Sequence, residues 1–222
     1  MTAASTRPRI VVLISGRGSN MQALVEASRH GDPAYEVAAV VSDQPEAGGL
    51  RIAAALGVPT RVVDRRDSAD RADFESRLAA AIHADSPALV VLAGFMRVLS
   101  PGFVGQFADR IQNIHPSLLP SFPGLHTHRR ALAAGALTHG ATVHYVTAEL
   151  DAGPPILQGR VAVMNGDDEA SLAARVQQVE HRMFPLAVRW HCSGRLRCAA
   201  GAAWLDGRRL DAPVALDSVA AC

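Results

Sequence analysis

Hydrophobic residues follow two alternating patterns in the first half of the chain. Runs of consecutive apolar residues, typical of strands buried on both faces, lie within 9–15, 36–42 and 88–93, and a further strand is expected at 60–63. Segments 21–28, 48–56 and 69–82 lie between them and repeat apolar residues at helical spacing. Strands that alternate with helices predict a mostly parallel sheet covered by helices, whose ligands bind beyond the carboxyl ends of the strands.

The second half predicts more strands and one long helix. Strands are expected at 110–114, 141–147 and 156–164, with helices at 129–134 and 169–190 and a hairpin turn at Asp206-Gly207. The expected fold class is α/β, with a mostly parallel, doubly wound (Rossmann-like) sheet and antiparallel C-terminal strands. Residues 9–210 are expected to form a single domain between a disordered tail, 1–8, and a loose tail, 211–222.

The composition excludes several classes of protein. The chain is 49% hydrophobic but has no apolar run long enough to span a membrane and no signal-peptide pattern, so a soluble, cytoplasmic protein is expected. A net charge of +1 gives no long-range attraction to nucleic acid. Lysine is absent, which excludes a lysine Schiff base and a P-loop lysine. Cys192, Cys198 and Cys222 contain no Cys-x-x-Cys pair, so neither a disulfide framework nor a zinc knuckle is indicated.

The first strand leads into the glycine-rich turn Gly16-Arg17-Gly18-Ser19-Asn20. Ser19 or Asn20 is expected to cap the following helix, whose free N–H groups attract phosphate. The third glycine of a dinucleotide fingerprint is missing, and no acidic residue clearly ends the second strand, so a dinucleotide is the less favoured ligand. A tight strand-to-helix turn that binds no ligand would explain residues 16–20 equally well.

An amide, an imidazole and a carboxylate are the main candidates for chemistry. Asn113 and His115 are two residues apart, so they share one face of an extended chain, and prolines at 116 and 120 indicate a rigid support. With the distant Asp151, these groups could stabilise an oxyanion, move a proton and fix the ionisation of the imidazole. An Asn-x-His pair alone is more often structural, and residues 147–155 alone could be a polar turn.

Other polar residues have weaker assignments. Arg97 follows the fourth strand in an apolar loop, so its charge should reach solvent, a ligand or a partner. Glu180 lies beside the apolar stripe of the last helix, where a partly buried acid usually has a partner, although the spacing alone somewhat favours a surface position. His126 and His128 are not at helical metal-ligand spacing, so a metal is not expected. His144 is interpreted as a structural, hydrogen-bonded histidine.

Four separated sites, 11–20, 92–97, 113–120 with 123–128, and 149–154, resemble the phosphoribosylglycinamide formyltransferases, folate-dependent enzymes of purine synthesis. The resemblance runs from about Arg9 to Leu210. It implies the formyltransferase fold and transfer of the formyl group of the co-substrate 10-formyltetrahydrofolate to the amine of 5'-phosphoribosylglycinamide. The products are formylglycinamide ribonucleotide and tetrahydrofolate. The implied partners are small molecules, without metal, nucleic acid or membrane, and the implied state is a monomer or homodimer.

The resemblance also implies a role for each matching residue. The catalytic residues are Asn113, His115 and Asp151, with Asp151 favouring the protonated imidazole of His115. Binding of glycinamide ribonucleotide is implied for Gly18, Ser19, Asn20 and Glu180. Binding of 10-formyltetrahydrofolate is implied for Arg71, Met96, Arg97, Val98, Leu99, Asn113, Thr147, Ala148, Glu149, Leu150 and Asp151.

Three other functions share part of this pattern. Formyltetrahydrofolate deformylase replaces the amine with water, and methionyl-tRNA formyltransferase uses an RNA substrate. The first usually carries an additional N-terminal domain and the second a C-terminal one, and neither is expected here. A non-catalytic phosphate- or nucleotide-binding module would need only Gly18, Ser19 and Asn20, and leaves Asn113, His115 and Asp151 without a common purpose.

Overall fold

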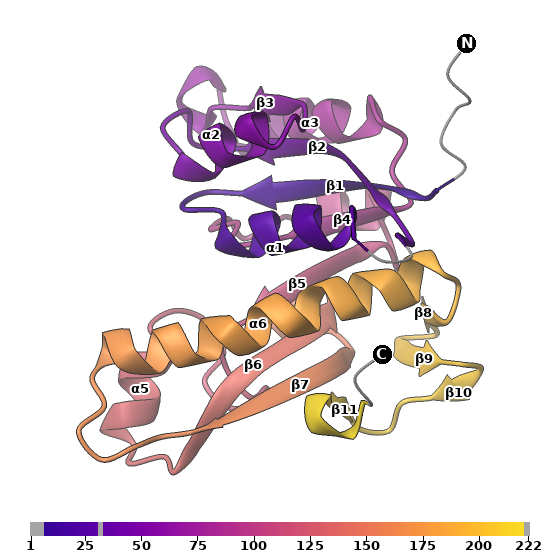
Figure 1. Ribbon diagram of the computed structural model, residues 1–222. Coiled ribbons are helices and arrows are strands. Elements are labelled where there is room, and N and C mark those ends of the chain that lie inside the picture. The colour runs from indigo at the N-terminus through magenta and orange to yellow at the C-terminus, as the bar shows by residue number, and fades with distance from the viewer. Residues whose placement is uncertain (1–6, 31–32, 220–222) are drawn as a thin grey trace. The chain divides into compact units, whose positions relative to one another are not determined.

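The structure is a computed structural model that describes residues 7–30 and 33–219 (Figure 1). The chain divides into two compact units, residues 1–96 and 97–222, and each is described separately. Residues 1–6 of the predicted disordered tail lie outside the described residues. The prediction that residues 9–210 form one domain stays a prediction.

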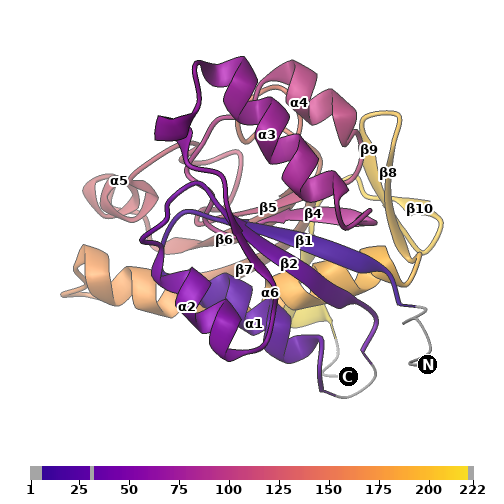
Figure 2. The same ribbon diagram turned by 90° about the horizontal axis from the view of Figure 1, so that it is seen from above.

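The first unit is a parallel sheet with helices on both faces. Strands β1 (Arg9–Ile14), β2 (Glu36–Ser42), β3 (Thr60–Val62) and β4 (Leu89–Leu92) pair in parallel in the order β4-β1-β2-β3. Helices α1 (Ser19–Ala27) and α2 (Gly48–Ala55) lie on one face of these strands, and α3 (Arg71–His83) lies on the other (Figure 2). A 3-10 turn, η1 (Arg65–Asp67), precedes α3. The predicted alternation and double winding are therefore present.

Burial on both faces explains the unbroken hydrophobic runs of this unit. Ile10 to Ile14 of β1 have no exposed surface, because β1 lies between β4 and β2 and under helices. Met21, Leu24 and Val25 are fully buried on the predicted face of α1. Each such side chain contributes roughly 1.5–3 kcal/mol through burial. The strand positions, and hence the turns at their carboxyl ends, are fixed by this core.

The second unit is built on antiparallel strands. Strands β5 (Ile111–His115), β6 (Thr138–Tyr145) and β7 (Pro155–Ala162) pair antiparallel, and β11 (Val214–Ala215) pairs in parallel with β7. The long helix α6 (Glu169–Cys192) packs against β6 and β7, and the short helix α5 (Thr127–Ala133) packs against α6. Strands β8 (Leu196–Ala199), β9 (Ala202–Leu205) and β10 (Arg208–Arg209) form a second, antiparallel sheet. The predicted turn at Asp206-Gly207 connects β9 to β10.

Three elements of the second unit were not predicted. Helix α4 (Pro101–Gln106) begins where the Ser100 hydroxyl accepts a hydrogen bond of 3.1 Å from the Phe103 N–H. A serine cap followed by proline is the ordinary signal for a helix start and was overlooked. In place of the loose tail expected after Leu210, the structure has β11 and the 3-10 turn η2 (Leu216–Ser218), where Leu216 is buried.

The predicted cap of α1 is wrong. The residue before the helix is Gly18, in the left-handed conformation with φ 81°, and Ser19 is already helical. A glycine has no side chain with which to cap, so the turn presents the first N–H groups of α1 without a polar side chain at the N-cap. Helix α6 begins at the predicted residue, Glu169, where Asp168 and Ser171 form a reciprocal capping box.

The described part of the chain contains no helix with the length and apolar character needed to cross a membrane.

Gly49 should tolerate no side chain. A Cβ atom there would lie 2.6 Å from Ile14 Cδ1 and 3.0 Å from Gly18 Cα, whereas one at Gly48 meets no described atom within 4 Å. We expect Gly49→Ala to lower the free energy of unfolding by about 1–3 kcal/mol and Gly48→Ala to leave it nearly unchanged. Urea denaturation of both variants measures the difference, and equal stabilities would contradict the packing of α2 against the glycine turn.

Candidate active site

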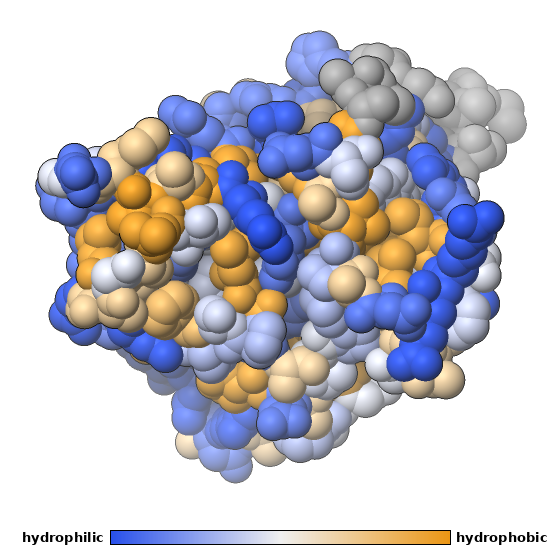
Figure 3. Space-filling view, turned by 90° about the horizontal axis from the view of Figure 1, so that it is seen from below, coloured by the Kyte–Doolittle hydropathy of each residue, from blue (hydrophilic) through white to orange (hydrophobic). Residues whose placement is uncertain are grey.

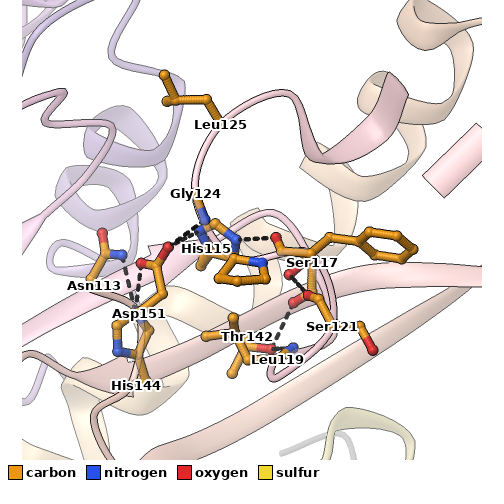
Figure 4. A network of polar contacts seen from close by, with 12 residues as sticks. Asn113, His115, Ser117, Leu119, Ser121, Gly124, Leu125, Thr142, His144 and Asp151 are labelled. Atoms are coloured by element: carbon orange, nitrogen blue, oxygen red, sulfur yellow. Dashed lines mark hydrogen bonds and ion pairs between the residues drawn. The ribbon is translucent and has the colours of Figure 1, made fainter. Parts of the chain in front are cut away.

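The second unit brings the three predicted catalytic residues together (Figure 4). Asn113 and His115 lie on β5, and Asp151 lies in the loop between β6 and β7. The Nδ1 atom of His115 is 3.4 Å from the Asp151 Oδ2 atom, and both side chains are 7% exposed. The spacing of Asn113 and His115 placed them correctly on one face, whereas only the fold shows that Asp151 reaches the same point.

The ring of His115 lies between two oxygen acceptors. Its Nε2 atom is 3.0 Å from the carbonyl oxygen of Phe122, and its Nδ1 atom faces the carboxylate of Asp151. A carbonyl oxygen can only accept, so the Nε2–H of His115 donates to it. The ring is therefore held at both nitrogens and has a defined orientation.

The backbone around Asp151 is shaped to place its carboxylate. Asp151 adopts the left-handed conformation with φ 52°, which aspartate tolerates better than most residues. The Gly124 N–H donates a hydrogen bond of 2.8 Å to its Oδ2 atom. Gly153 crosses close to the end of β6, where an added Cβ would lie 1.8 Å from the Tyr145 carbonyl oxygen. Only glycine at 153 allows the loop to approach so closely.

A hydrogen-bond network supports the segment after His115. The Thr142 hydroxyl donates to the Ser117 carbonyl at 2.7 Å and accepts from the Leu119 N–H at 3.0 Å. Gln158 donates to the Leu119 carbonyl at 2.8 Å, and the Ser117 hydroxyl donates to the Ser121 carbonyl at 2.6 Å. These contacts tie the segment 117–121 to β6 and β7, as Figure 4 shows for most of them. They supply the rigid support that the prolines indicated.

A fourth polar side chain, His144, belongs to the same cluster. Its Nε2 atom is 3.1 Å from the Asn113 Nδ2 atom and 3.8 Å from the Asp151 Oδ1 atom. Its Nδ1 atom is 2.9 Å from the Tyr145 carbonyl oxygen. Burial lowers the pKa of His144, although the Tyr145 carbonyl and Asp151 partly oppose this effect. His144 was expected to be structural, and its position beside Asn113 was not predicted.

Two further histidines lie near the cluster. His139 Nε2 is 3.2 Å from His128 Nδ1, and the His139 ring packs edge-on against Phe122. Burial lowers the pKa of His139 to about 4, with smaller contributions in the same direction from His128 and His115. Burial also lowers the pKa of His128. His126, by contrast, is an exposed residue at the start of α5.

No three metal-ligating side chains lie close enough to hold a metal ion within residues 7–30 and 33–219. Cys192 and Cys198 are free thiols, and Cys222 lies outside the described residues. Burial raises the pKa of each of the two thiols to about 12, so neither is a thiolate nucleophile at neutral pH.

The glycine turn in the first unit has the features of an anion-binding loop. The Gly49 N–H donates to the Gly16 carbonyl at 3.0 Å, which holds the start of α2 against the turn. Ala47 precedes α2 and, like Gly18 before α1, has no polar side chain with which to cap. Arg17 and Arg51 line an open cavity of about 500 Å³ with Gly48, Ile52 and Ala55. Helix starts and guanidinium groups both favour an anion.

Asp43 directly follows β2 and was overlooked in the sequence. Its carboxylate is buried and accepts a hydrogen bond of 2.6 Å from the Ser15 hydroxyl. The same hydroxyl accepts a hydrogen bond of 2.9 Å from the Met96 N–H. Ser15 thus joins the carboxyl ends of β1, β2 and β4. Because the Asp43 carboxylate is hydrogen-bonded to Ser15, it does not support binding of a dinucleotide.

The predicted folate-binding residues differ in exposure. Met96 and Val98 are 68% and 61% exposed, Arg97 is exposed, and Leu99 is buried. Arg71, in the first turn of α3, forms an ion pair of 3.0 Å with Glu75. Thr147, Ala148, Glu149 and Leu150 are exposed in the loop before Asp151.

Hydrophobic surface is not confined to these segments. Leu125, Leu137 and Met164 are also exposed, and the face shown in Figure 3 mixes hydrophobic with hydrophilic residues. Glu180, on α6, is buried with 7% exposure, which fits the predicted position beside the apolar stripe.

Comparison with known proteins identifies the class. A family model described as formyl transferase matches residues 8–188, so the chain belongs to the formyl transferase family. It is 49% identical to the phosphoribosylglycinamide formyltransferase of Escherichia coli (strain K12) over 90% of this chain and 95% of the relative. It is 41% identical to the human trifunctional purine biosynthetic protein adenosine-3 over 86% of this chain and 19% of that protein.

Solved structures give the same result. The phosphoribosylglycinamide formyltransferase of Coxiella burnetii superposes with a TM-score of 0.90, at 44% identity, over 94% of this chain and 99% of that one. The glycinamide ribonucleotide transformylase 1 of Symbiobacterium toebii gives a TM-score of 0.87 at 41% identity, over 92% of this chain and 97% of that one. The predicted family and the predicted fold class are confirmed.

Acid should destabilise the protein through His139. Its folded pKa, about 4, lies below the ordinary value of 6.5, so the unfolded chain takes up the proton first. The resulting stability is complete above pH 6.5 and is lost as the pH falls from 6.5 to about 4.

We therefore expect His139→Gln to reduce the dependence of unfolding free energy on pH in this window, while His128 and His144, whose pKa values burial also lowers, continue to contribute in the same direction. Urea denaturation from pH 4 to 8 measures it. The control is His30→Gln, at an exposed position on the other unit, which should retain the full dependence. An unchanged pH dependence in His139→Gln would show that His139 does not contribute to it.

Proposed function

We propose that the chain transfers the formyl group of 10-formyltetrahydrofolate to the amine of 5'-phosphoribosylglycinamide, as the names of its relatives indicate. The observation that carries the proposal is the convergence of Asn113, His115 and Asp151 in a chain that is 49% identical to a phosphoribosylglycinamide formyltransferase. An amide, an imidazole and a carboxylate suffice for formyl transfer, because the substrate amine is itself the nucleophile.

The reaction begins when the free amine of the substrate attacks the formyl carbon. A carbon–nitrogen bond forms, and the formyl oxygen becomes an oxyanion in a tetrahedral intermediate. A proton moves from the attacking nitrogen to the folate nitrogen, directly or through water. The bond between the formyl carbon and the folate nitrogen then breaks, which releases formylglycinamide ribonucleotide and tetrahydrofolate.

Asn113 and protonated His115 stabilise the oxyanion. Each donor of this kind contributes roughly 2.7–4 kcal/mol to the transition state in comparable sites. Support comes from the two oxygen acceptors that face the His115 ring, since they suit a ring with a hydrogen on each nitrogen. The contact with Asp151, at 3.4 Å, is the longer of the two, so the Nδ1–H is the donor more easily shared with an oxyanion. Asp151 supplies the negative charge that favours the imidazolium.

The glycine turn binds the phosphate of the ribonucleotide through Gly18, Ser19 and Asn20. The turn supports this role because the N-terminus of α1 follows a glycine and carries a partial positive charge. Glu180 binds the glycinamide end of the substrate, where a carboxylate attracts an amine.

Arg71, Met96, Arg97, Val98, Leu99 and the loop Thr147–Asp151, with Asn113, bind the folate co-substrate. Exposed hydrophobic side chains at Met96, Val98 and Leu150 support contact with an aromatic ring system, and Arg71 and Arg97 can bind carboxylates. The cytoplasmic location and the monomeric or dimeric state stay predictions.

An assay of formyl loss from 10-formyltetrahydrofolate, with and without phosphoribosylglycinamide, tests the function. We expect tetrahydrofolate to form only when the ribonucleotide is present, with one formylglycinamide ribonucleotide produced for each formyl group lost. Loss without the amine would instead indicate a deformylase. No loss under either condition would favour a binding module and overturn the proposal.

Replacing the catalytic residues should reduce turnover without unfolding the chain. We expect Asn113→Ala, His115→Ala and Asp151→Asn each to lower kcat by about 100-fold or more, the usual effect of losing one oxyanion donor or its support. The control is Asp211→Asn, whose side chain is 91% exposed and which should keep wild-type kcat. Steady-state kinetics with circular dichroism checks this, and near-normal kcat in any of the three would overturn that residue's role.

A further inference from the structure

Asn113 faces a specific partner across the sheet. Residues Asn113 and His144 are directly opposite in the antiparallel pairing of β5 and β6, so their side chains lie on the same face. The Asn113 Nδ2 and His144 Nε2 atoms are 3.1 Å apart, which is a hydrogen bond (Figure 4). His144 is 2% exposed, so this contact is sheltered from water.

The hydrogen bonds determine which nitrogen of His144 carries the proton. Its Nδ1 atom lies 2.9 Å from the Tyr145 carbonyl oxygen, which can only accept, so Nδ1 carries the hydrogen. Burial lowers the pKa of His144, so the ring is neutral at neutral pH and has one hydrogen. The Nε2 atom is then a lone-pair acceptor, and the amide group of Asn113 must turn its Nδ2–H toward it.

A neutral His144 also does not compete with His115 for the Asp151 carboxylate. The His144 Nε2 atom lies 3.8 Å from Asp151 Oδ1, and a protonated Nε2 would compete with His115 for that carboxylate. Because Nε2 has no hydrogen, it can accept from Asn113 but cannot donate to Asp151. The His144 ring thus orients the Asn113 amide without donating a hydrogen bond to Asp151.

We infer that His144 is a positioning residue for formyl transfer, which holds the Asn113 amide by one Nδ2–H so that the other Nδ2–H points toward the position of the formyl oxygen. The inference rests on the proposed function for its kinetic consequence. Its structural part, the Nδ1–H tautomer with an accepting Nε2, stands without it. His144 acts through Asn113 and contacts neither reactant.

Two amide substitutions separate the two nitrogens of the ring. In His144→Asn the short side chain reaches the Nδ1 position, keeps the contact with the Tyr145 carbonyl and withdraws the acceptor from Asn113. In His144→Gln the longer side chain places its carbonyl near the Nε2 position and restores an acceptor. We expect His144→Asn to lower kcat by about 100-fold, as loss of one oriented donor does, with each KM within about 3-fold of wild type. We expect His144→Gln to recover at least a tenth of wild-type kcat.

A double-mutant cycle tests whether His144 acts through Asn113. If it does, His144→Asn should lower kcat in the wild-type background and have little further effect in the Asn113→Ala background. An equal loss in both backgrounds, or wild-type kcat in His144→Asn, would overturn the inference. Thermal unfolding of all variants identifies any that fail to fold. If His144→Asn fails to fold, the kcat of His144→Gln is compared with that of the wild type instead.

The tautomer has a readout that does not need activity. Nitrogen-15 NMR of the histidine side chains should show His144 neutral at pH 7.5, with hydrogen on Nδ1 and none on Nε2. A hydrogen on Nε2 would overturn the inference even in a fully active protein. Failure of the wild-type assay with the expected tautomer in place would instead overturn the proposed function and, with it, the kinetic role of His144.

Discussion

Burial of the Asp151 carboxylate is the constraint on which the arrangement of the site depends. A carboxylate that loses its water needs partners, because an unpaired buried charge costs several kcal/mol. The fold supplies a backbone N–H from Gly124 at 2.8 Å and the ring of His115 at 3.4 Å. The left-handed backbone at Asp151 and the close approach of Gly153 to β6 bring the carboxylate to these partners. The loop conformation and the His115 contact therefore both serve to give the buried Asp151 carboxylate its partners.

The neighbouring histidines His115 and His144 both face the Asp151 carboxylate but differ in their other partners. His115 faces two oxygen acceptors, whereas His144 has one acceptor and lies next to an amide. Both rings are nearly buried, so burial alone does not distinguish them. The difference lies in the partners that each nitrogen meets. Within a single cluster, His115 thus meets an oxygen acceptor at each ring nitrogen, whereas the Nε2 atom of His144 meets the donor amide of Asn113.

Local patterns predicted most of the fold because the strands and helices have strong periodic signals. The unbroken apolar runs of β1, β2 and β4 required burial on both faces, and the structure has it. The two-residue spacing of Asn113 and His115 was enough to place both on one face of β5. Helix α4 was missed although Ser100 and Pro101 are an ordinary start signal, because the preceding apolar loop dominated that stretch. The cap of α1 was wrong because Gly18 takes the N-cap position in a left-handed conformation.

The parts of the site that the sequence could not predict depend on pairing between distant segments. His144 is opposite Asn113 only because β5 and β6 pair in one register, and a shift of one residue would turn its side chain to the other face. That register is stabilised where Thr142, two residues before His144, binds the Ser117 carbonyl and the Leu119 N–H. The network that supports the segment after His115 therefore also fixes the partner of Asn113. Strand register thus controls the surroundings of both Asn113 and His115, and the sequence of one strand does not reveal which strand pairs with it or in which register.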